Sequence, residues 1–281
     1  MKHIAFAVAL AAPFLAVPAF ADQAVSINFA GEIAGKPFSC TDTFDGLGTK
    51  STPVKGIDYR AFVSNAALIR ADGTAQPIAL EQDGKWQLES LALLDFEDAT
   101  GGCSTGTAET NTALRGTVPD GDYVGLAFDL AVPFEQNHND PTLAAAPLNT
   151  TAMFWNWQGG YRFVRIDMVP VNKAAEGPKG WFLHLGSTMC PAASKTESPT
   201  AECKNPNHLP VSFAAFDPAK NVVVIDPAAV VAEADLTINA PDTSPGCMSF
   251  LNDSDCNTVM GKLGQAYGDL PAGAQQLVTM R

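Results

Sequence analysis

The sequence predicts an all-β protein, a β-sandwich with long disulfide-stapled loops and little helix. Short segments alternate apolar and polar residues, as in Gln23–Phe29 and Tyr123–Val132, which is the pattern of half-buried strands. Turn residues such as Asp72-Gly73 and Pro119-Asp120-Gly121 separate these segments. No stretch of any length shows the periodicity of an amphipathic helix. Many short strands with turn signals between them favour a sandwich over other all-β folds.

The N-terminus predicts export. Ile4–Val17 is apolar after a weakly basic start, and Ala19-Phe20-Ala21 supplies a small-x-small cleavage site. The alternative is a membrane anchor or an ordinary N-terminal helix, but the apolar run is short for a span, contains Pro13 and is followed by Pro18. We therefore expect a signal peptide over residues 1–21 and a single exported, periplasmic domain over residues 22–281 with no membrane insertion.

The charge balance excludes two classes of partner. Thirty Asp and Glu against seventeen Lys and Arg give a net charge of −13. This field repels nucleic acids and anionic membrane surfaces. It suits a protein that meets cations or a basic partner, although solubility alone also explains it.

Six cysteines follow the predicted cleavage site. An even number in an exported chain indicates disulfides, and six cysteines allow 15 pairings. Local spacing favours Cys190–Cys203 and Cys247–Cys256, which leaves Cys40–Cys103 as a longer staple. The second of these loops belongs to a C-terminal appendage. A thiolate metal site is the alternative, but the chain has no CxxC pair.

The most distinctive stretch is the aromatic segment Met153–Asp167. It contains Trp155 and Trp157, then a Gly-Gly break and an alternating run. A hairpin-like turn at Glu176–Gly180 predicts that Arg162–Val169 and Trp181–Leu185 pair as antiparallel strands. This pairing places a histidine of the second strand near the start of the first, close to Trp157.

Three histidines follow the cleavage site: His138, His184 and His208. Histidine is the commonest protein ligand of copper and zinc, and two of these residues flank the aromatic segment. An open site with few ligands suits Cu(I), for which methionine is a soft additional donor. The methionines nearest to these features are Met153, Met189 and Met248.

Other interpretations compete with a metal site. His138 in an Asn/Asp loop can be a surface residue, and His184 can be a buried strand histidine. Trp155, Trp157 and Tyr161 can form a platform for a carbohydrate or a protein in a sandwich that binds no metal. A weaker alternative is a hydrolase that uses Asp95, Glu97 or Asp98, which requires these carboxylates to lie in an open cleft.

Catalytic motifs are scarce in this sequence. It lacks HExxH, a glycine-rich phosphate loop and SxxK, and Leu185-Gly186-Ser187-Thr188 is not a nucleophile elbow because it lacks the GxSxG frame. We therefore expect a binding protein rather than an enzyme.

Several uncommon residues recur in the order of one known family. The most specific motif is Met153-Phe154-Trp155-x-Trp157-Gln158-x-Gly160-Tyr161. The further motifs are Pro37-Phe38-Ser39-Cys40, Tyr59-Arg60-Ala61-Phe62-Val63-Ser64-Asn65, Leu93-Leu94-Asp95-Phe96-Glu97-Asp98, Cys103-x-x-Gly106-Thr107, Asn137-His138, Phe182-x-His184-Leu185-Gly186-Ser187, Asn205-Pro206-Asn207 and Gly246-Cys247-Met248-Ser249. With these motifs the mature chain resembles the four-Cys family of the "metallo-mystery pair" system, whose relatives include the copper-associated periplasmic protein of methanobactin operons.

The resemblance implies a function and a partner. It implies periplasmic copper binding, with copper as Cu(I), and a MauG-like dihaem c-type peroxidase that oxidises a tryptophan to kynurenine near the metal. Carried over, His138 and His184 are the copper ligands, and Trp155 or Trp157 is the oxidised residue, with Met153 beside the site. One departure is His208, where we expect arginine in the family; it can extend the site or be a neutral surface change.

Overall fold

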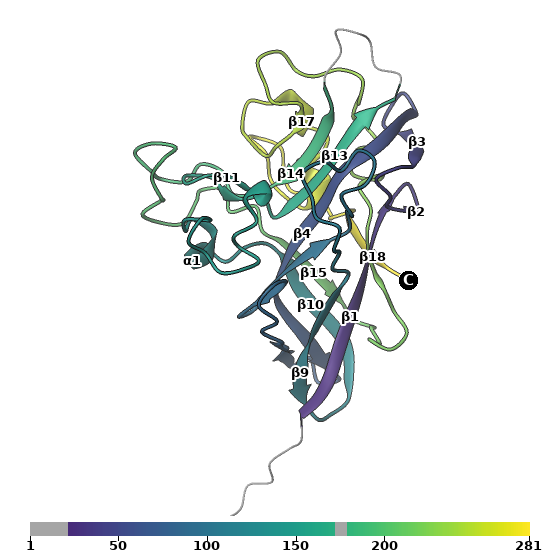
Figure 1. Cartoon of the computed structure of the whole chain (residues 1–281), viewed down its shortest axis with the longest axis vertical. Helices are drawn as coiled ribbons and strands as arrows, with labels where there is room; N and C mark the ends of the chain where they lie inside the picture. Colours follow the sequence, from purple (N-terminus) through teal and green to yellow (C-terminus); the bar gives the residue numbers. More distant parts are fainter. Residues whose placement is uncertain (1–21, 172–178) are drawn as a thin grey trace, which may run out of the picture.

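The computed structural model describes residues 22–171 and 179–281, and it contains two sheets that pack against each other (Figure 1). The smaller sheet has the strand order β18-β16-β1-β9-β6, with β2 paired to β1. Its strands are β1 Asp22–Ile33, β2 Lys36–Pro37, β6 Ala79–Leu80, β9 Ala113–Pro119, β16 Val223–Ile225 and β18 Val278–Met280. The signal peptide predicted for residues 1–21 lies outside the described residues.

The larger sheet has the order β15-β10-β4-β13-β14-β17, with β3, β5, β7 and β8 added around β4. Its strands are β3 Thr43–Leu47, β4 Thr52–Arg70, β5 Ala75–Pro77, β7 Gln87–Leu88, β8 Leu91–Asp95, β10 Tyr123–Leu130, β13 Val164–Pro170, β14 Trp181–Leu185, β15 Leu209–Phe213 and β17 Gly246–Cys247.

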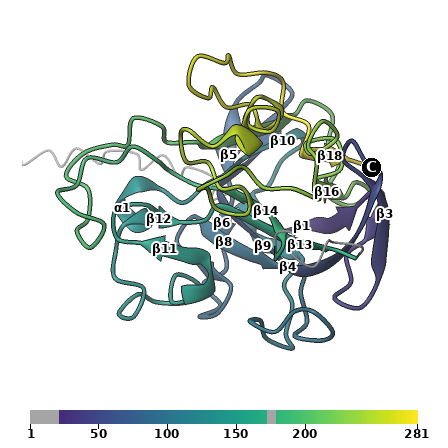
Figure 2. The same ribbon diagram turned by 90° about the horizontal axis from the view of Figure 1, so that it is seen from above.

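The remaining elements are short. A two-stranded ribbon joins β11 Phe154–Asn156 to β12 Gly160–Tyr161. The helical turns are α1 Phe134–Asn137, η1 Thr151–Met153, η2 Ser254–Cys256 and η3 Met260–Leu263. Figure 2 shows α1 and the β11–β12 ribbon on one side of the molecule, with β3, β16 and β18 on the opposite side. These observations confirm the all-β sandwich with little helix. None of the described helices is long and apolar enough to cross a membrane.

Strand β4 organises the larger sheet because it pairs with five other strands. Along one edge it pairs with β13 over its first half and with β10 over its second half. Along the other edge it pairs in turn with β3, β8 and β5. Asn65, at a left-handed φ of 54°, lies where pairing with β8 ends. Most of β4 is therefore held by strand pairing on both sides.

The two faces of this sheet carry different chemistry. Tyr59, Ile166 and Leu183 lie directly opposite one another on β4, β13 and β14, and all three are buried in the hydrophobic core. Their neighbours in sequence point to the other face, because side chains alternate along a strand. On β4 these neighbours are Asp58 and Arg60, so the second face is charged although it is also buried.

Contacts between the sheets close the core. Phe29 of β1 packs edge-on against Phe128 of β10, with ring centroids 5.6 Å apart. The fully buried Tyr59 hydroxyl donates to the carbonyls of Ile225 in β16 and Glu32 in β1. One apolar cluster continues through both sheets.

The predicted disulfides and strand pairing are confirmed. Sulfur–sulfur bonds join Cys40 to Cys103, Cys190 to Cys203 and Cys247 to Cys256. Strands β13 and β14 are antiparallel neighbours, with Arg165 opposite His184. The turn predicted at Glu176–Gly180 lies mostly outside the described residues.

Replacement of Tyr59 by phenylalanine tests the contact between the sheets. Tyr59→Phe leaves two buried carbonyls without their hydroxyl donor, so we expect the free energy of unfolding to fall by about 1–3 kcal/mol. Urea unfolding with the disulfides intact measures this change. A loss below about 0.5 kcal/mol, the range of a neutral surface substitution, would contradict the role given to this hydrogen bond.

Candidate metal centre

Three segments distant in sequence meet beside the β11–β12 ribbon. The Asn137 side chain accepts a hydrogen bond from the Tyr161 amide (2.8 Å) and lies 3.4 Å from Ser187 Oγ, just after β14. The His138 ring contacts the backbone of Trp157, and the His184 ring lies beside the ring of Trp155. Each histidine therefore contacts a different tryptophan. The expectation placed His184 near Trp157, whereas the ring that it contacts is that of Trp155.

His138 is held as a neutral ring with one defined lone pair. It follows α1 directly, and only 5% of it is exposed. Its Nδ1 lies 3.2 Å from the Trp157 carbonyl, which can only accept, so Nδ1 carries the proton. Nε2 accepts from the Asn137 amide (3.2 Å) and lies 3.7 Å from Cys203 Sγ. Burial lowers the pKa of His138, although the Trp157 carbonyl and Glu202 act to raise it.

His184 is also neutral but its two nitrogens have charged partners. Arg162 Nε can only donate and lies 3.2 Å from Nδ1, so Nδ1 holds the lone pair. Nε2 then donates to Asp167 Oδ1 at 2.5 Å. Burial lowers the pKa of His184, although Asp167 acts to raise it, and the cations Arg162 and Arg165 lower it further. This arrangement matches a metal-ligating histidine oriented by an outer carboxylate, except that Arg162 occupies the ligand position.

His184 ends a row of charged residues that crosses four strands. Asp95 of β8 lies opposite Arg60 of β4, Arg60 lies opposite Arg165 of β13, and Arg165 lies opposite His184 of β14. Directly opposed side chains share one face of a sheet. Asp167 lies two residues after Arg165, on the same face, and accepts from it at 2.8 and 2.9 Å.

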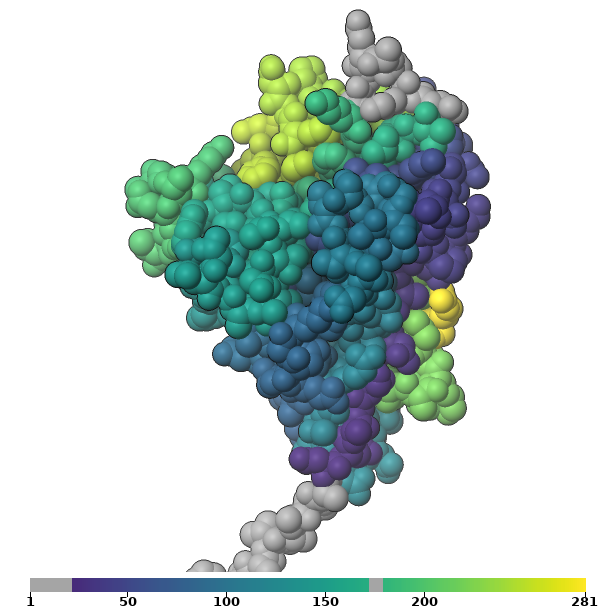
Figure 3. Space-filling view, viewed as in Figure 1, coloured from purple at the N-terminus to yellow at the C-terminus, as the bar shows by residue number. Residues whose placement is uncertain are grey.

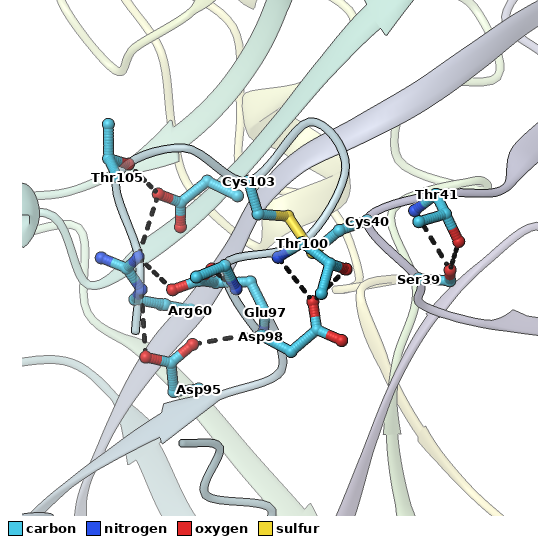
Figure 4. The surroundings of a disulfide bond; sticks show 12 residues. Ser39, Cys40, Thr41, Arg60, Asp95, Glu97, Asp98, Thr100, Cys103 and Thr105 are labelled. Carbon is cyan, nitrogen blue, oxygen red and sulfur yellow. Dashed lines mark hydrogen bonds and ion pairs between the residues drawn. A yellow bond between two sulfur atoms is a disulfide. The ribbon is translucent and has the colours of Figure 1, made fainter. Parts of the chain in front are cut away.

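Three carboxylates surround Arg60 in this row, and Figure 4 shows two of them, Asp95 and Glu97. The Arg60 Nη2 lies 2.5 Å from Glu97 Oε1 and 3.5 Å from Asp58 Oδ2. Its Nε lies 3.2 Å from Asp95 Oδ2 without an aligned hydrogen bond. Arg165 joins the second half of the row to the first, because its Nη1 lies 2.9 Å from Asp58 Oδ2. Isolated buried charges are very costly, so the two arginines need carboxylates around them in the interior.

The loop after β8 covers the row and depends on Glu97. The Glu97 carboxylate accepts from the amides of Ala99 (3.0 Å) and Thr107 (3.1 Å). A Cβ atom on Gly106 would lie 1.5 Å from Glu97 Oε1, so only glycine fits there. The Cys40–Cys103 disulfide closes the same loop (Figure 4).

Burial perturbs the carboxylates of the row. Desolvation raises the pKa of Asp95 to about 7 and that of Asp58 to about 6, against the opposing effect of the arginines. Burial also acts to raise the pKa of Asp167, but His184 and Arg165 outweigh it and hold this pKa below its ordinary value. Desolvation and the nearby Arg165 lower the pKa of Arg162 to about 10.

The two tryptophans have different surroundings. The Trp155 ring lies 6.3 Å from the His184 ring and 5.1 Å from the Phe250 ring, between ring centroids. The Arg162 guanidinium lies over it at 5.6 Å, and its buried Nε1 has no hydrogen-bond partner. The Trp157 ring contacts Phe154 edge-on, at 6.4 Å.

Other predicted residues lie elsewhere. Met153 is buried in the hydrophobic core, and the His208 ring packs against Phe163 (5.5 Å). Asp95 and Glu97 are buried with Arg60, and Asp98 is a surface residue that binds Thr100. The open acidic cleft that the hydrolase alternative requires is therefore wrong for Asp95 and Glu97.

Sulfur-containing donor groups also occur near the site. Among the described residues, His138 groups with Cys190 and Cys203, and Glu97 groups with Cys40 and Cys103, with the ligand atoms of each group within 4.8 Å of one another. All four cysteines are in disulfides. No such group of three among the described residues contains both His138 and His184. Their assignment as the ligand pair stays a prediction.

The fold and the site define a disulfide-stapled β-sandwich with two buried neutral histidines flanking a tryptophan pair. A family model described as MbnP matches residues 22–249. The solved structure of MbnP from Methylosinus trichosporium superposes with a TM-score of 0.81 and 30% sequence identity, over 92% of this chain and 98% of that chain. Among curated proteins, no similar sequence was found. The chain belongs to the MbnP family, which confirms the resemblance seen in the motifs.

Sequence reasoning missed the partners of the histidines. The tautomer and the pKa of His184 depend on Asp167, Arg162 and Arg165. The Nε2 of His138 accepts a hydrogen bond from Asn137. None of these partners was predicted to belong to the site. The available signal was charge at alternate positions within apolar strands, as in Asp58 and Arg60. Charges placed this way must either face water or pair with each other in the interior.

The raised pKa of Asp95 predicts a pH effect on stability. The folded protein holds this proton up to about pH 7, whereas the unfolded chain releases it near the ordinary value of 3.8. The resulting stabilisation is present below about pH 4 and is lost as the pH rises through about 7. Asp95→Asn mimics the protonated acid. Between pH 5 and 8 we therefore expect the free energy of unfolding of this variant to exceed that of the wild type by about 1 kcal/mol or more.

Urea unfolding at several pH values measures this difference. Asp98→Asn is the matched control, because Asp98 lies three residues away at the surface and its pKa is lowered by hydrogen bonds from Thr100. Parallel stability–pH curves for the wild type and Asp95→Asn would refute a proton held at Asp95.

Proposed function

We propose that this protein is an exported periplasmic copper-binding protein of copper homeostasis, with no catalytic activity of its own. Membership of the methanobactin-operon-associated MbnP family is consistent with a copper-related function. The observation that carries the proposal is the pair of neutral imidazoles on either side of the tryptophan segment. A neutral imidazole is the form that binds copper, and burial lowers the pKa of both rings, which favours this form.

A copper ion would use one nitrogen of each histidine, and a protein donor must turn away from each of them. On His138 this donor is the Asn137 amide. His138 offers Nε2, because the Trp157 carbonyl holds the proton on Nδ1. His184 offers Nδ1, because Asp167 accepts from Nε2. Arg162 must turn away from Nδ1, and its other hydrogen bonds to the Ala152 and Phe154 carbonyls can hold it nearby. Two imidazole nitrogens leave an open, low-coordinate site of the kind that Cu(I) accepts.

The same proposal includes a modified tryptophan, and we assign it to Trp155. Its ring lies against His184 and its indole N–H has no partner to lose. A MauG-like dihaem peroxidase is the proposed oxidant. Two molecules of hydrogen peroxide convert the indole to N-formylkynurenine and two waters, and hydrolysis then releases formate. The product places a ketone and an aromatic amine beside the histidine, where indole offers only N–H.

The aromatic-platform alternative is less well supported. A platform needs flat rings that face solvent side by side. Trp155 is instead enclosed by His184, Phe250 and Arg162, and the Trp157 ring meets Phe154 edge-on.

Removal of the two imidazoles tests the ligand assignment. His138→Ala and His184→Ala should each weaken Cu(I) binding by about tenfold or more, and the double variant should abolish tight binding. Competition with a chromophoric Cu(I) chelator measures the affinity. His208→Ala is the control, since the His208 ring packs on Phe163 and not on either tryptophan, and its carbonyl accepts from Gln265. Unchanged affinity in the double variant would refute the assignment of His138 and His184 as the copper ligands.

Co-production with the peroxidase tests the modification. Intact mass should show the gain of one oxygen and the loss of one carbon, located in the peptide that contains Trp155. Trp155→Phe should abolish this change, whereas Trp157→Phe should retain it. A modified residue at Trp157 in the wild type would refute the choice of Trp155 and leave the copper site untouched.

A further inference from the structure

The Cys190–Cys203 disulfide lies against the lone pair of His138. Nε2 of His138 is 3.7 Å from Cys203 Sγ, and the Nε2 and the two sulfurs lie within 4.8 Å of one another. A histidine nitrogen this close to two sulfurs is a complete three-ligand set once the sulfurs are thiolates. Soft thiolates and imidazole together favour Cu(I) and related soft ions.

The surroundings hold this histidine in the form that binds a metal. The Trp157 carbonyl keeps the proton on Nδ1, as the outer partner of a metal-bound histidine does. Ser198, inside the disulfide loop, donates to the His138 carbonyl at 2.7 Å. The loop and the histidine are therefore joined by a contact that does not depend on the disulfide.

Reagents can reach the disulfide from the surface. Cys190 lines a cavity of about 250 Å³ that also borders Gln158, Thr188 and the half-exposed Met189. Most residues between the two cysteines are at least partly exposed. Figure 3 shows this loop (green) at the edge of the molecule beside the segment that contains α1 and β11 (teal).

The other disulfides lack these features. Glu97 lies near the sulfurs of Cys40 and Cys103, but Arg60 and the amides of Ala99 and Thr107 already occupy its oxygens. Cys247 and Cys256 are fully buried, and among the described residues no histidine groups with them. Only Cys190–Cys203 combines a nearby histidine lone pair, two sulfurs and an opening to solvent.

We infer that reduction of Cys190–Cys203 creates a second copper-binding state, a His–Cys–Cys site made of His138, Cys190 and Cys203. Two electrons and two protons from a dithiol reductant break the S–S bond and leave two thiols, while the reductant becomes a disulfide. Binding of Cu(I) then releases the two thiol protons, and the two thiolates and His138 Nε2 hold the ion. This state shares His138 with the proposed function but does not need His184 or a modified tryptophan.

The test uses the full exported chain without oxygen. A phosphine reduces the protein, taking up the oxygen atom of water, and is removed before titration with Cu(I). Reduction should tighten Cu(I) binding by about tenfold or more and produce thiolate-to-copper charge-transfer absorption. His184→Ala should keep this gain, whereas His138→Ala should lose it. Oxidised protein that binds no Cu(I) contradicts the proposed function, and a reduced protein without any gain contradicts this inference.

Two further measurements distinguish loss of the proposed site from misfolding of a variant. In reduced wild-type protein, Cu(I) should block alkylation of Cys190 and Cys203 but not of Cys40 and Cys103, as peptide mapping shows. The variant Cys190→Ser/Cys203→Ser should lose the gain on reduction, whereas Cys40→Ser/Cys103→Ser should keep it. Equal alkylation of both pairs in the presence of Cu(I), or a Cys190–Cys203 bond that resists reduction in the folded protein, would overturn the site.

Discussion

The pairing of buried charges on the outer face of β4, β13 and β14 is the constraint on which the rest of the structure depends. Arg60 and Arg165 are enclosed by Asp58, Asp95, Glu97 and Asp167, and without these carboxylates two cations would lie in the interior without compensation. The loop after β8 must therefore close over the row. Its disulfide, its glycine at position 106 and its amide donors to Glu97 all serve that closure.

The same row determines the chemistry of one side of the candidate site. Because Arg165 lies opposite His184, the network ends at an imidazole that Asp167 and Arg162 hold in one tautomer. A site built on paired strands is held in position more firmly than one on loops. His138 comes from a loop, and its orientation depends on one carbonyl and one side-chain amide. The site thus has a rigid side and a side that is set by loop contacts.

The three disulfides have different surroundings and, we conclude, different roles. Cys40–Cys103 closes the loop over the charged row. Cys247–Cys256 ties the C-terminal appendage to β17, which extends the sheet beside β14. Cys190–Cys203 touches the lone pair of His138 and opens to a cavity, which is why we propose it as the redox-sensitive pair.

From the sequence alone we could predict the fold class and the antiparallel pairing that carries His184, and cysteine spacing favoured the three disulfide pairs that the structure contains. These features depend on local signals: alternation, turn residues and the spacing of cysteines. It also singled out His138, His184, Trp155 and Trp157, because histidines and tryptophans are rare in this chain. The folded structure was needed to show which tryptophan contacts which histidine. It was also needed to show that Asp95 and Glu97 pair with Arg60. It also revealed that a disulfide lies against His138. Those contacts join strands and loops far apart in the chain, and no local pattern encodes the register that brings them together.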